Sequence, residues 1–213
     1  MISTPLTRLG CALAAAALLG GCSLLSKPQP TVIYLLPGGQ FAAANPAPRV
    51  DWSLRVTRPK TNAGSESARI AVVPEPDRLS FYKNARWSDP ASVMLRDRLI
   101  EALRASGRLD RLSSDDDNLR ADYVLGGNLR GFQSEYRAGV PEARVSLDAQ
   151  LIDARSRGLL ASRRFEVRRG AKSSAVTDVV QAFGEASDEV ARQVRDWVLQ
   201  QALPAAPAVP TPR

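Results

Sequence analysis

The first 22 residues constrain this chain most, because they decide which part of the sequence is left to fold. Arg8 is followed by the apolar run 9–19, which is too short to cross a membrane but has the length of the apolar core of a secretory signal. Gly20 and Gly21 then provide the small side chains that precede a signal cleavage site. We therefore predict that residues 1–21 are a signal peptide and that the mature chain begins at Cys22.

The tetrapeptide Leu19-Gly20-Gly21-Cys22 resembles the lipobox of bacterial lipoproteins. This resemblance implies that the Cys22 sulfur receives a diacylglycerol, that the chain is cut after Gly21, and that the new amino terminus is usually acylated. Each buried methylene contributes roughly 0.8 kcal/mol to membrane binding, so several acyl chains hold a protein nearly permanently. The alternative is an ordinary signal peptide that leaves Cys22 as a free thiol.

The use of cysteine and histidine excludes several classes of enzyme. The chain has no His, and its two Cys residues are Cys11 in the signal and Cys22 at the predicted lipid. Ser-His-Asp triads, Cys-His dyads and zinc sites built from His or Cys are therefore excluded from the mature domain. Gly126-Gly127 lies in a strand-like pattern without a Walker-type Lys, so no phosphate loop is expected. We expect no enzyme, cofactor or metal site, although composition leaves carboxylate, Lys or Tyr chemistry open.

The mature chain carries a modest positive charge. Of the 29 basic residues only Arg8 lies in the signal, which leaves 28 against 22 acidic residues and a net charge of +6. The Arg residues are scattered along the chain, with Arg163-Arg164 and Arg168-Arg169 as the nearest clusters, whereas a nucleic-acid module would concentrate them beside stacking aromatic residues, so no nucleic-acid binding is expected. The basic residues form either a solvated face or a contact with anionic lipid headgroups or an acidic partner.

The mature chain divides into a tether, one domain and a tail. Residues 22–31 are short, polar and interrupted by Pro, which suits a tether between the lipid and a folded domain. The 192 residues that follow the signal are an ordinary size for one core, and we expect the domain over residues 32–203. Residues 204–213 repeat Pro and Ala and are expected to form a disordered tail.

Hydrophobic periodicity predicts the strands of this domain. Alternating patterns or compact β-branched runs indicate six strands, the last three of them as an antiparallel meander: residues 32–36, 52–57, 69–74, 123–129, 143–151 and 159–167. Asp115-Asp116-Asp117 is interpreted as a solvated turn rather than a cation-binding loop, because it lacks the spaced ligands of an EF-hand.

Two helices should cover the sheet. The first is expected to begin with Asp89 as its N-cap and Pro90 at its first position, and to end at Gly107. The second is expected over residues 174–200, with a kink near Gly184 or a projection beyond the sheet. The predicted fold class is α/β of the α+β type: a single two-layer domain with a mixed, mainly antiparallel sheet covered by two main amphipathic helices.

Short motifs spread over most of the mature chain carry a family resemblance. They are Tyr34-Leu35-Leu36-Pro37, Val73-Pro74 with Leu79 and Tyr82, Arg86-Trp87 before Asp89-Pro90, Ala121-Asp122-Tyr123-Val124-Leu125-Gly126-Gly127, and Ala182-Phe183 with Trp197. In this order behind a lipobox, they resemble the ABC-type transport auxiliary lipoprotein family, which includes the PqiC-like lipoproteins. The tail and the loop 40–49 show no family motif.

The resemblance implies a non-catalytic lipoprotein that faces the periplasm. It would work with an MCE-domain protein and the permease and ATPase of an ABC transporter, moving lipids or other hydrophobic molecules between the inner and outer membranes. Ser23, rather than Asp, follows Cys22 and implies sorting to the outer membrane. Self-association is left open.

The segment that contains Phe81, Tyr82, Arg86 and Trp87 is the candidate partner contact, because aromatic residues and Arg are enriched at interface hot spots. The alternative is that Tyr82 and Trp87 cover the end of the core. Two other functions also stay open at this point: a lipoprotein activator of a cell-envelope enzyme or secretion complex, and a lipid-binding carrier with an apolar cavity.

Overall fold

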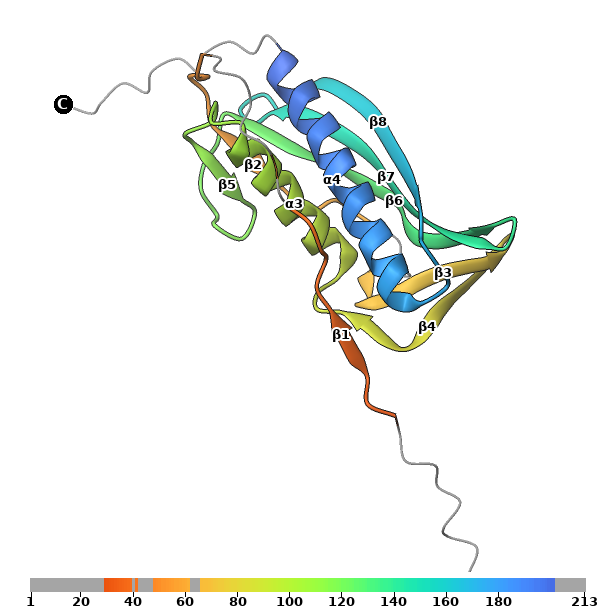
Figure 1. The fold of residues 1–213 in the computed structure, drawn as a ribbon. Coiled ribbons are helices and arrows are strands. Elements are labelled where there is room, and N and C mark those ends of the chain that lie inside the picture. Colours follow the sequence, from red (N-terminus) through yellow and green to blue (C-terminus); the bar gives the residue numbers. More distant parts are fainter. Residues whose placement is uncertain (1–28, 40, 42–47, 62–65, 202–213) are drawn as a thin grey trace, which may run out of the picture. The chain divides into compact units, whose positions relative to one another are not determined.

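The computed structural model describes residues 29–39, 41, 48–61 and 66–201, and every helix and strand described lies in the unit that begins at Thr31. An eight-stranded mixed sheet carries two helices, which confirms the predicted α+β class (Figure 1). The strands are β1 Val32–Tyr34, β2 Leu54–Val56, β3 Arg69–Glu75, β4 Arg78–Trp87, β5 Leu112–Ser114, β6 Tyr123–Arg137, β7 Val140–Asp153 and β8 Leu159–Gly170. The helices are α3 Ala91–Ala105 and α4 Val176–Gln200.

Strand β6 is the centre of the sheet. Along one edge it pairs with β7, which pairs in turn with β8, and both pairings are antiparallel as the predicted meander requires. Along the other edge β6 has two parallel neighbours in succession, β2 beside its first residues and β3 near its end. The short strands β5 and β1 complete the sheet by parallel pairing with β2 and β4. The longest pairings are therefore antiparallel, while the short parallel pairings of β2 and β3 with β6, and of β5 and β1 with their neighbours, make the sheet mixed.

A β-bulge in β6 explains why only its first half was predicted. Tyr123, Leu125 and Leu129 face the core with period two, as the sequence indicates. Between Leu129 and Gly131 the register with β7 shifts by one residue, after which Phe132 takes the buried position. A bulge of this kind reverses the alternation of faces, so a pattern of fixed period does not reach the strand's true end.

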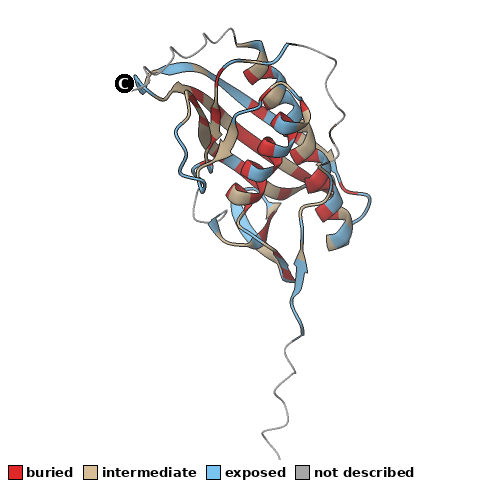
Figure 2. Ribbon diagram, turned by 90° about the vertical axis from the view of Figure 1, so that its left-hand side faces the viewer, coloured by how far each residue is buried: buried red, intermediate tan, exposed pale blue. Residues whose placement is uncertain are grey.

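Helices α3 and α4 lie side by side on one face of the sheet, and Figure 2 shows buried residues where they meet it. Trp87 of β4, Phe132 of β6 and Phe183 of α4 form the aromatic centre of the core. Trp87 meets Phe183 edge-on at 5.3 Å between ring centroids, and Phe132 stacks on Phe183 at 4.9 Å. Among the described residues, no helix combines the length and apolar character that a membrane crossing requires.

The start of α3 corrects two predictions, since Asp89 is not its N-cap and Pro90 is not its first helical residue, while its end confirms a third. Asp89 is not the N-cap: that position belongs to Pro90, whose ψ of 144° is extended, and the helix begins at Ala91 without a side-chain cap. The φ of Pro90 is −55°, close to the value that the Pro ring fixes, and Pro has no N–H to satisfy, so it can occupy this position without a capping contribution from Asp89. Gly107 adopts a φ of 65° just after the helix, as expected of a residue that terminates it.

Two strands were not anticipated. β4 covers the aromatic segment, where Asn84 has a φ of 54° and the register with β3 shifts twice, so the sequence shows no steady alternation. β5 has only three half-buried residues and therefore leaves no hydrophobic signature.

Candidate functional site

The segment after β1 is fastened to both helices by one ion pair. Arg98 of α3 is buried, and its guanidinium donates hydrogen bonds to the carbonyl oxygens of Leu36 at 3.0 Å and Pro37 at 3.1 Å. The same guanidinium pairs with the carboxylate of Asp188 on α4. Asp188 in turn accepts the backbone N–H of Gly39, with both oxygens 3.1 Å from the nitrogen. We call Arg98, Asp188 and residues 36–39 the N-terminal clamp.

Three glycines make this close approach possible. Gly38 and Gly39 have φ values of 93° and 89°, a region that residues with a side chain rarely occupy. On α4, a Cβ atom at Gly184 would lie 2.5 Å from the Pro37 carbonyl oxygen, so only glycine lets the segment rest on the helix. Gly184, near which the sequence predicts a kink, therefore permits this close contact, and α4 continues across it as one helix.

The clamp was not predicted from the sequence, although part of its signal was present. Pro37-Gly38-Gly39 indicated a turn, and Gly184 interrupted an otherwise regular helix. Arg98 lies one residue before buried Leu99, and Asp188 one residue after buried Ser187. A charged residue within the buried stripe of each of two neighbouring helices indicates a pair, because an unpaired buried charge is costly.

A second fastening joins β2 to the start of β6 and accounts for the motif at residues 121–127. The Asp122 carboxylate accepts the Ser53 backbone N–H at 2.7 Å and the Ser53 hydroxyl at 2.6 Å. Burial opposes ionisation of Asp122, but the hydrogen bonds from Ser53 outweigh it and lower the pKa of this carboxyl. Gly127 has a φ of 140°, and a Cβ there would overlap the Asp148 carbonyl oxygen on β7. The motif is therefore explained by local geometry and needs no ligand.

The four candidate contact residues alternate between the two faces of β4. Trp87 is buried against Phe183, and Tyr82 points to the same helix-covered face, where its hydroxyl lies 3.3 Å from the Ser134 hydroxyl of β6. The outer face carries Phe81, whose ring lies 3.5 Å below the Arg69 guanidinium, and Arg86, which is the register partner of Arg69. The Trp87 side chain thus belongs to the core. Partner contact by Phe81, Tyr82 and Arg86 stays a prediction.

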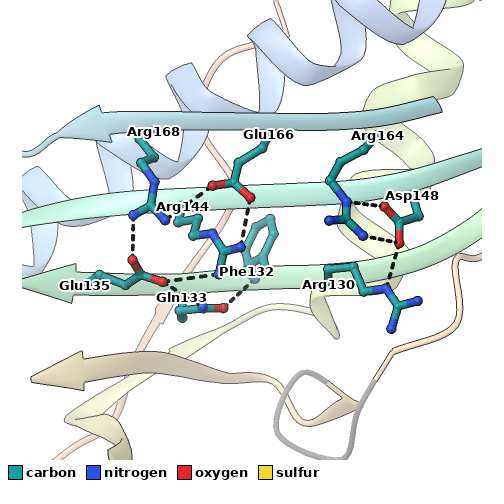
Figure 3. A network of polar contacts seen from close by, with 9 residues as sticks. All are labelled: Arg130, Phe132, Gln133, Glu135, Arg144, Asp148, Arg164, Glu166 and Arg168. Atoms are coloured by element: carbon teal, nitrogen blue, oxygen red, sulfur yellow. Dashed lines mark hydrogen bonds and ion pairs between the residues drawn. The ribbon is translucent and has the colours of Figure 1, made fainter. Parts of the chain in front are cut away.

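The outer face of the meander is a network of ion pairs between Arg and carboxylate side chains (Figure 3). Asp148 lies between Arg130 and Arg164, with N to O distances of 2.8 and 2.6 Å. Hydrogen bonding from Arg164 in particular lowers the pKa of Asp148 to about 2, despite the opposing effect of burial. The single Asp148 carboxylate offsets part of the charge of these two arginines, so this face is polar without being strongly basic.

The same network continues towards the β6–β7 turn. Arg144 donates to Glu166 at 2.8 Å, and this bond is the main reason that the pKa of Glu166 is lowered to about 2. Arg168 bridges Glu135 at 2.5 Å and Glu166 at 3.2 Å. Arg163-Arg164 and Arg168-Arg169 therefore do not form one positive patch, because Arg164 and Arg168 each form an ion pair with a carboxylate.

The acidic turn after β5 holds a buried arginine. Arg96 of α3 pairs with Asp115 at 2.8 Å and Asp116 at 2.5 Å, while Asp117 accepts the Ser114 backbone N–H at 2.7 Å. Burial works against ionisation of Asp115, yet hydrogen bonds from Arg96 and the Arg58 backbone lower its pKa. Within the described residues, no group of His, Cys, Asp and Glu has the arrangement of a metal site. The turn is thus a partner of α3 as well as a solvated loop.

Cys22, the predicted lipid attachment residue, lies outside the described residues, as do most of the tether and the whole tail 204–213. Their predicted roles rest on the sequence.

Comparison with known proteins identifies the family of the chain. A protein from Xanthomonas campestris of the family DUF330 has a crystal structure with a TM-score of 0.73 and 33% sequence identity, covering 79% of this chain and 95% of that one. An uncharacterized protein of known structure has a TM-score of 0.62 at 15% identity, covering 80% and 99% of the two chains, and shows the fold alone. No curated protein matches the chain.

The family profile covers the N-terminal clamp and the contact between Ser53 and Asp122. The profile of the ABC-type transport auxiliary lipoprotein component matches residues 34–195, from Tyr34 beside the clamp to Arg195 in α4. The matched region includes every strand after β1 and all of α3. The chain therefore belongs to the ABC-type transport auxiliary lipoprotein family.

Proposed function

We propose that this protein is a lipid-anchored component of an envelope transport system that contains an MCE-domain protein and an ABC transporter. Membership of the family supports an auxiliary, non-catalytic role in ABC-type transport. The finer assignments are part of the proposal: acylation of Cys22, the outer membrane as its location, the MCE-domain partner, and lipids or other hydrophobic molecules as cargo. The proposed boundaries are residues 1–21 for the signal, 22–31 for the tether, 32–203 for the domain and 204–213 for the tail.

The N-terminal clamp is the observation that carries this proposal. A flexible tether joined to a loose chain end would leave the domain free to turn relative to its anchor. Here the backbone of residues 36–39 is bonded to Arg98 on α3 and Asp188 on α4. The helix layer is therefore connected to the end of the chain that leads to Cys22. Such a connection suits a protein that works by being placed between a membrane and a partner.

The tether is also short. Ten peptide units separate Cys22 from Val32, and an extended chain spans at most about 3.6 Å per residue, or about 36 Å. An anchor at Cys22 would therefore keep β1 near the membrane surface. The absence of His from the whole sequence, together with a mature chain whose sole Cys is Cys22, agrees with a role in contact rather than catalysis.

Substitution of Cys22 tests the anchor. Cys22→Ala should leave the domain folded but release it from the membrane fraction and abolish transport. Cys11→Ala is the matched control, because Cys11 is the other Cys of the chain and leaves with the signal in this proposal. If Cys22→Ala still supported transport from the soluble fraction, the anchored mechanism would be wrong.

Cross-linking in intact envelopes, followed by mass spectrometry of the captured proteins, tests the partner. The wild-type protein should capture an MCE-domain protein or an ABC permease. Capture of a cell-wall synthase or a secretion complex instead would support the activator function and contradict the transport proposal.

A further inference from the structure

The segment of β1 exposes a row of large apolar side chains. Val32 is 51% exposed, Ile33 61% and Leu35 74%, and Figure 2 shows this strand as an exposed extension of the domain. Tyr34 and Leu36 alternate with Ile33 and Leu35 and pack against the core, so Ile33 and Leu35 lie on the outer side of the segment, whereas Val32 shares the side of Tyr34. Apolar side chains that gather on an ordered surface mark a contact with something else, whereas single exposed ones need no explanation.

The backbone holds these side chains in place. Val32 and Ile33 pair in parallel register with Ala85 and Arg86 of β4, and the Tyr34 carbonyl accepts the Ser88 N–H at 2.9 Å. The clamp fixes the chain immediately after Leu35. The apolar row is thus presented by a rigid support.

Basic side chains without acidic partners border the row. Arg86 is the register partner of Ile33, so the two side chains share a face of the sheet. Arg69, the register partner of Arg86, lies on the same face above Phe81. Arg69, Arg86 and the exposed Lys83 form no ion pair with any described residue, in contrast to the arginines of the meander. The surface therefore combines exposed apolar groups with free positive charge.

We propose that Ile33 and Leu35 insert into the surface of the membrane that holds the Cys22 acyl chains, while Arg69, Lys83 and Arg86 contact anionic headgroups. This inference rests on the proposed lipid anchor. Apolar side chains flanked by Lys and Arg are the composition of protein surfaces that bind the membrane interface. The tether supports a membrane over other occupants, since it ends at β1 and is no longer than about 36 Å. The domain would then stand on β1, with β2 and β5 at its opposite end (Figure 1).

Spin labelling of the lipidated protein in vesicles tests this contact. The mature chain offers no free thiol when Cys22 is acylated, so Ile33→Cys creates a single labelling site. Leu159→Cys is the matched control, because Leu159 is 57% exposed at the start of β8. Both labelled proteins are reconstituted into phosphatidylethanolamine and phosphatidylglycerol vesicles. Collision rates are measured with oxygen, which concentrates in lipid, and with a nickel chelate, which stays in water.

The label at position 33 should favour oxygen over the nickel chelate several-fold more than the label at position 159. Adding Lys83→Glu and Arg86→Glu should reduce that preference. Equal accessibility at both positions would overturn the proposal. Shielding from both reagents would also overturn it, because a second copy of the chain or a partner protein would then cover β1. Mass spectrometry of the same sample reports whether Cys22 is acylated, so failure of the anchor is distinguished from failure of the contact.

Discussion

Arg98 of α3 and Asp188 of α4 form an ion pair whose other hydrogen bonds, within the described part of the chain, go to the backbone of residues 36–39, and Arg98 also forms an ion pair with Glu101. Neither helix contacts the N-terminal segment through apolar packing alone. The pair consequently joins three parts of the chain, and loss of either member leaves polar groups unsatisfied at the junction.

Arg98→Ala should destabilise the domain and loosen residues 36–39. Removing one member of a buried ion pair typically costs about 3 kcal/mol, because the remaining charge is left without a partner. Urea unfolding measures the free energy, and hydrogen exchange should show faster exchange of the Gly39 amide. Arg104→Ala is the control, since Arg104 is an exposed residue of the same helix. Unchanged exchange at Gly39 in Arg98→Ala would show that the clamp does not depend on this side chain.

Gly184→Ala tests whether the segment rests directly on α4. Replacing Gly by Ala inside a helix ordinarily stabilises it by about 1 kcal/mol. Here the added methyl group would lie 2.5 Å from the Pro37 carbonyl oxygen, so the substitution should instead destabilise by about 1 to 3 kcal/mol. The midpoint of thermal unfolding shows whether Gly184→Ala stabilises or destabilises the domain. Gly170→Ala, where an added Cβ meets nothing within 4 Å, should change the midpoint little.

The ion pairs of the meander predict acid sensitivity. Hydrogen bonds from Arg164 and Arg144 lower the pKa of Asp148 and of Glu166 to about 2, below the values of about 4 in an unfolded chain. Their contribution to stability is therefore present above about pH 4.5 and is lost as the pH falls towards 2. Allowing for solvent screening, each carboxylate should contribute about 1 kcal/mol.

Urea midpoints at pH 5.5 and pH 2.5 measure this contribution. The double variant Asp148→Asn/Glu166→Gln should lose stability at pH 5.5 and show a smaller decrease on acidification than the wild type. The difference between the two proteins should narrow at high salt, because the pairs lie on a solvated face. A variant with the full acid sensitivity of the wild type would assign that sensitivity to other carboxylates.

The fold could be predicted where one side of an element is buried without interruption. Residues 143–151 of β7 alternate strictly, and Phe165 and Val167 of β8 face the core as expected. Prediction failed where local geometry breaks the period, at the β6 bulge and at Asn84 in β4. The clamp was missed for a different reason: its polar contacts join residues up to 149 positions apart, and no sequence period encodes such a distance.

The opposite faces of β4 allow the two interpretations of its aromatic residues to be separated. Trp87→Ala removes a fully buried ring and should cost about 3 to 5 kcal/mol, measured by urea unfolding. Phe81→Ala removes an outer-face ring whose main described contact is with Arg69, and it should cost about 1 kcal/mol or less. If this face binds a protein partner, Phe81→Ala should nevertheless reduce the yield of envelope cross-linking. A stable Phe81→Ala protein with undiminished capture would exclude Phe81 from the partner contact and leave the outer face of β4 to the membrane.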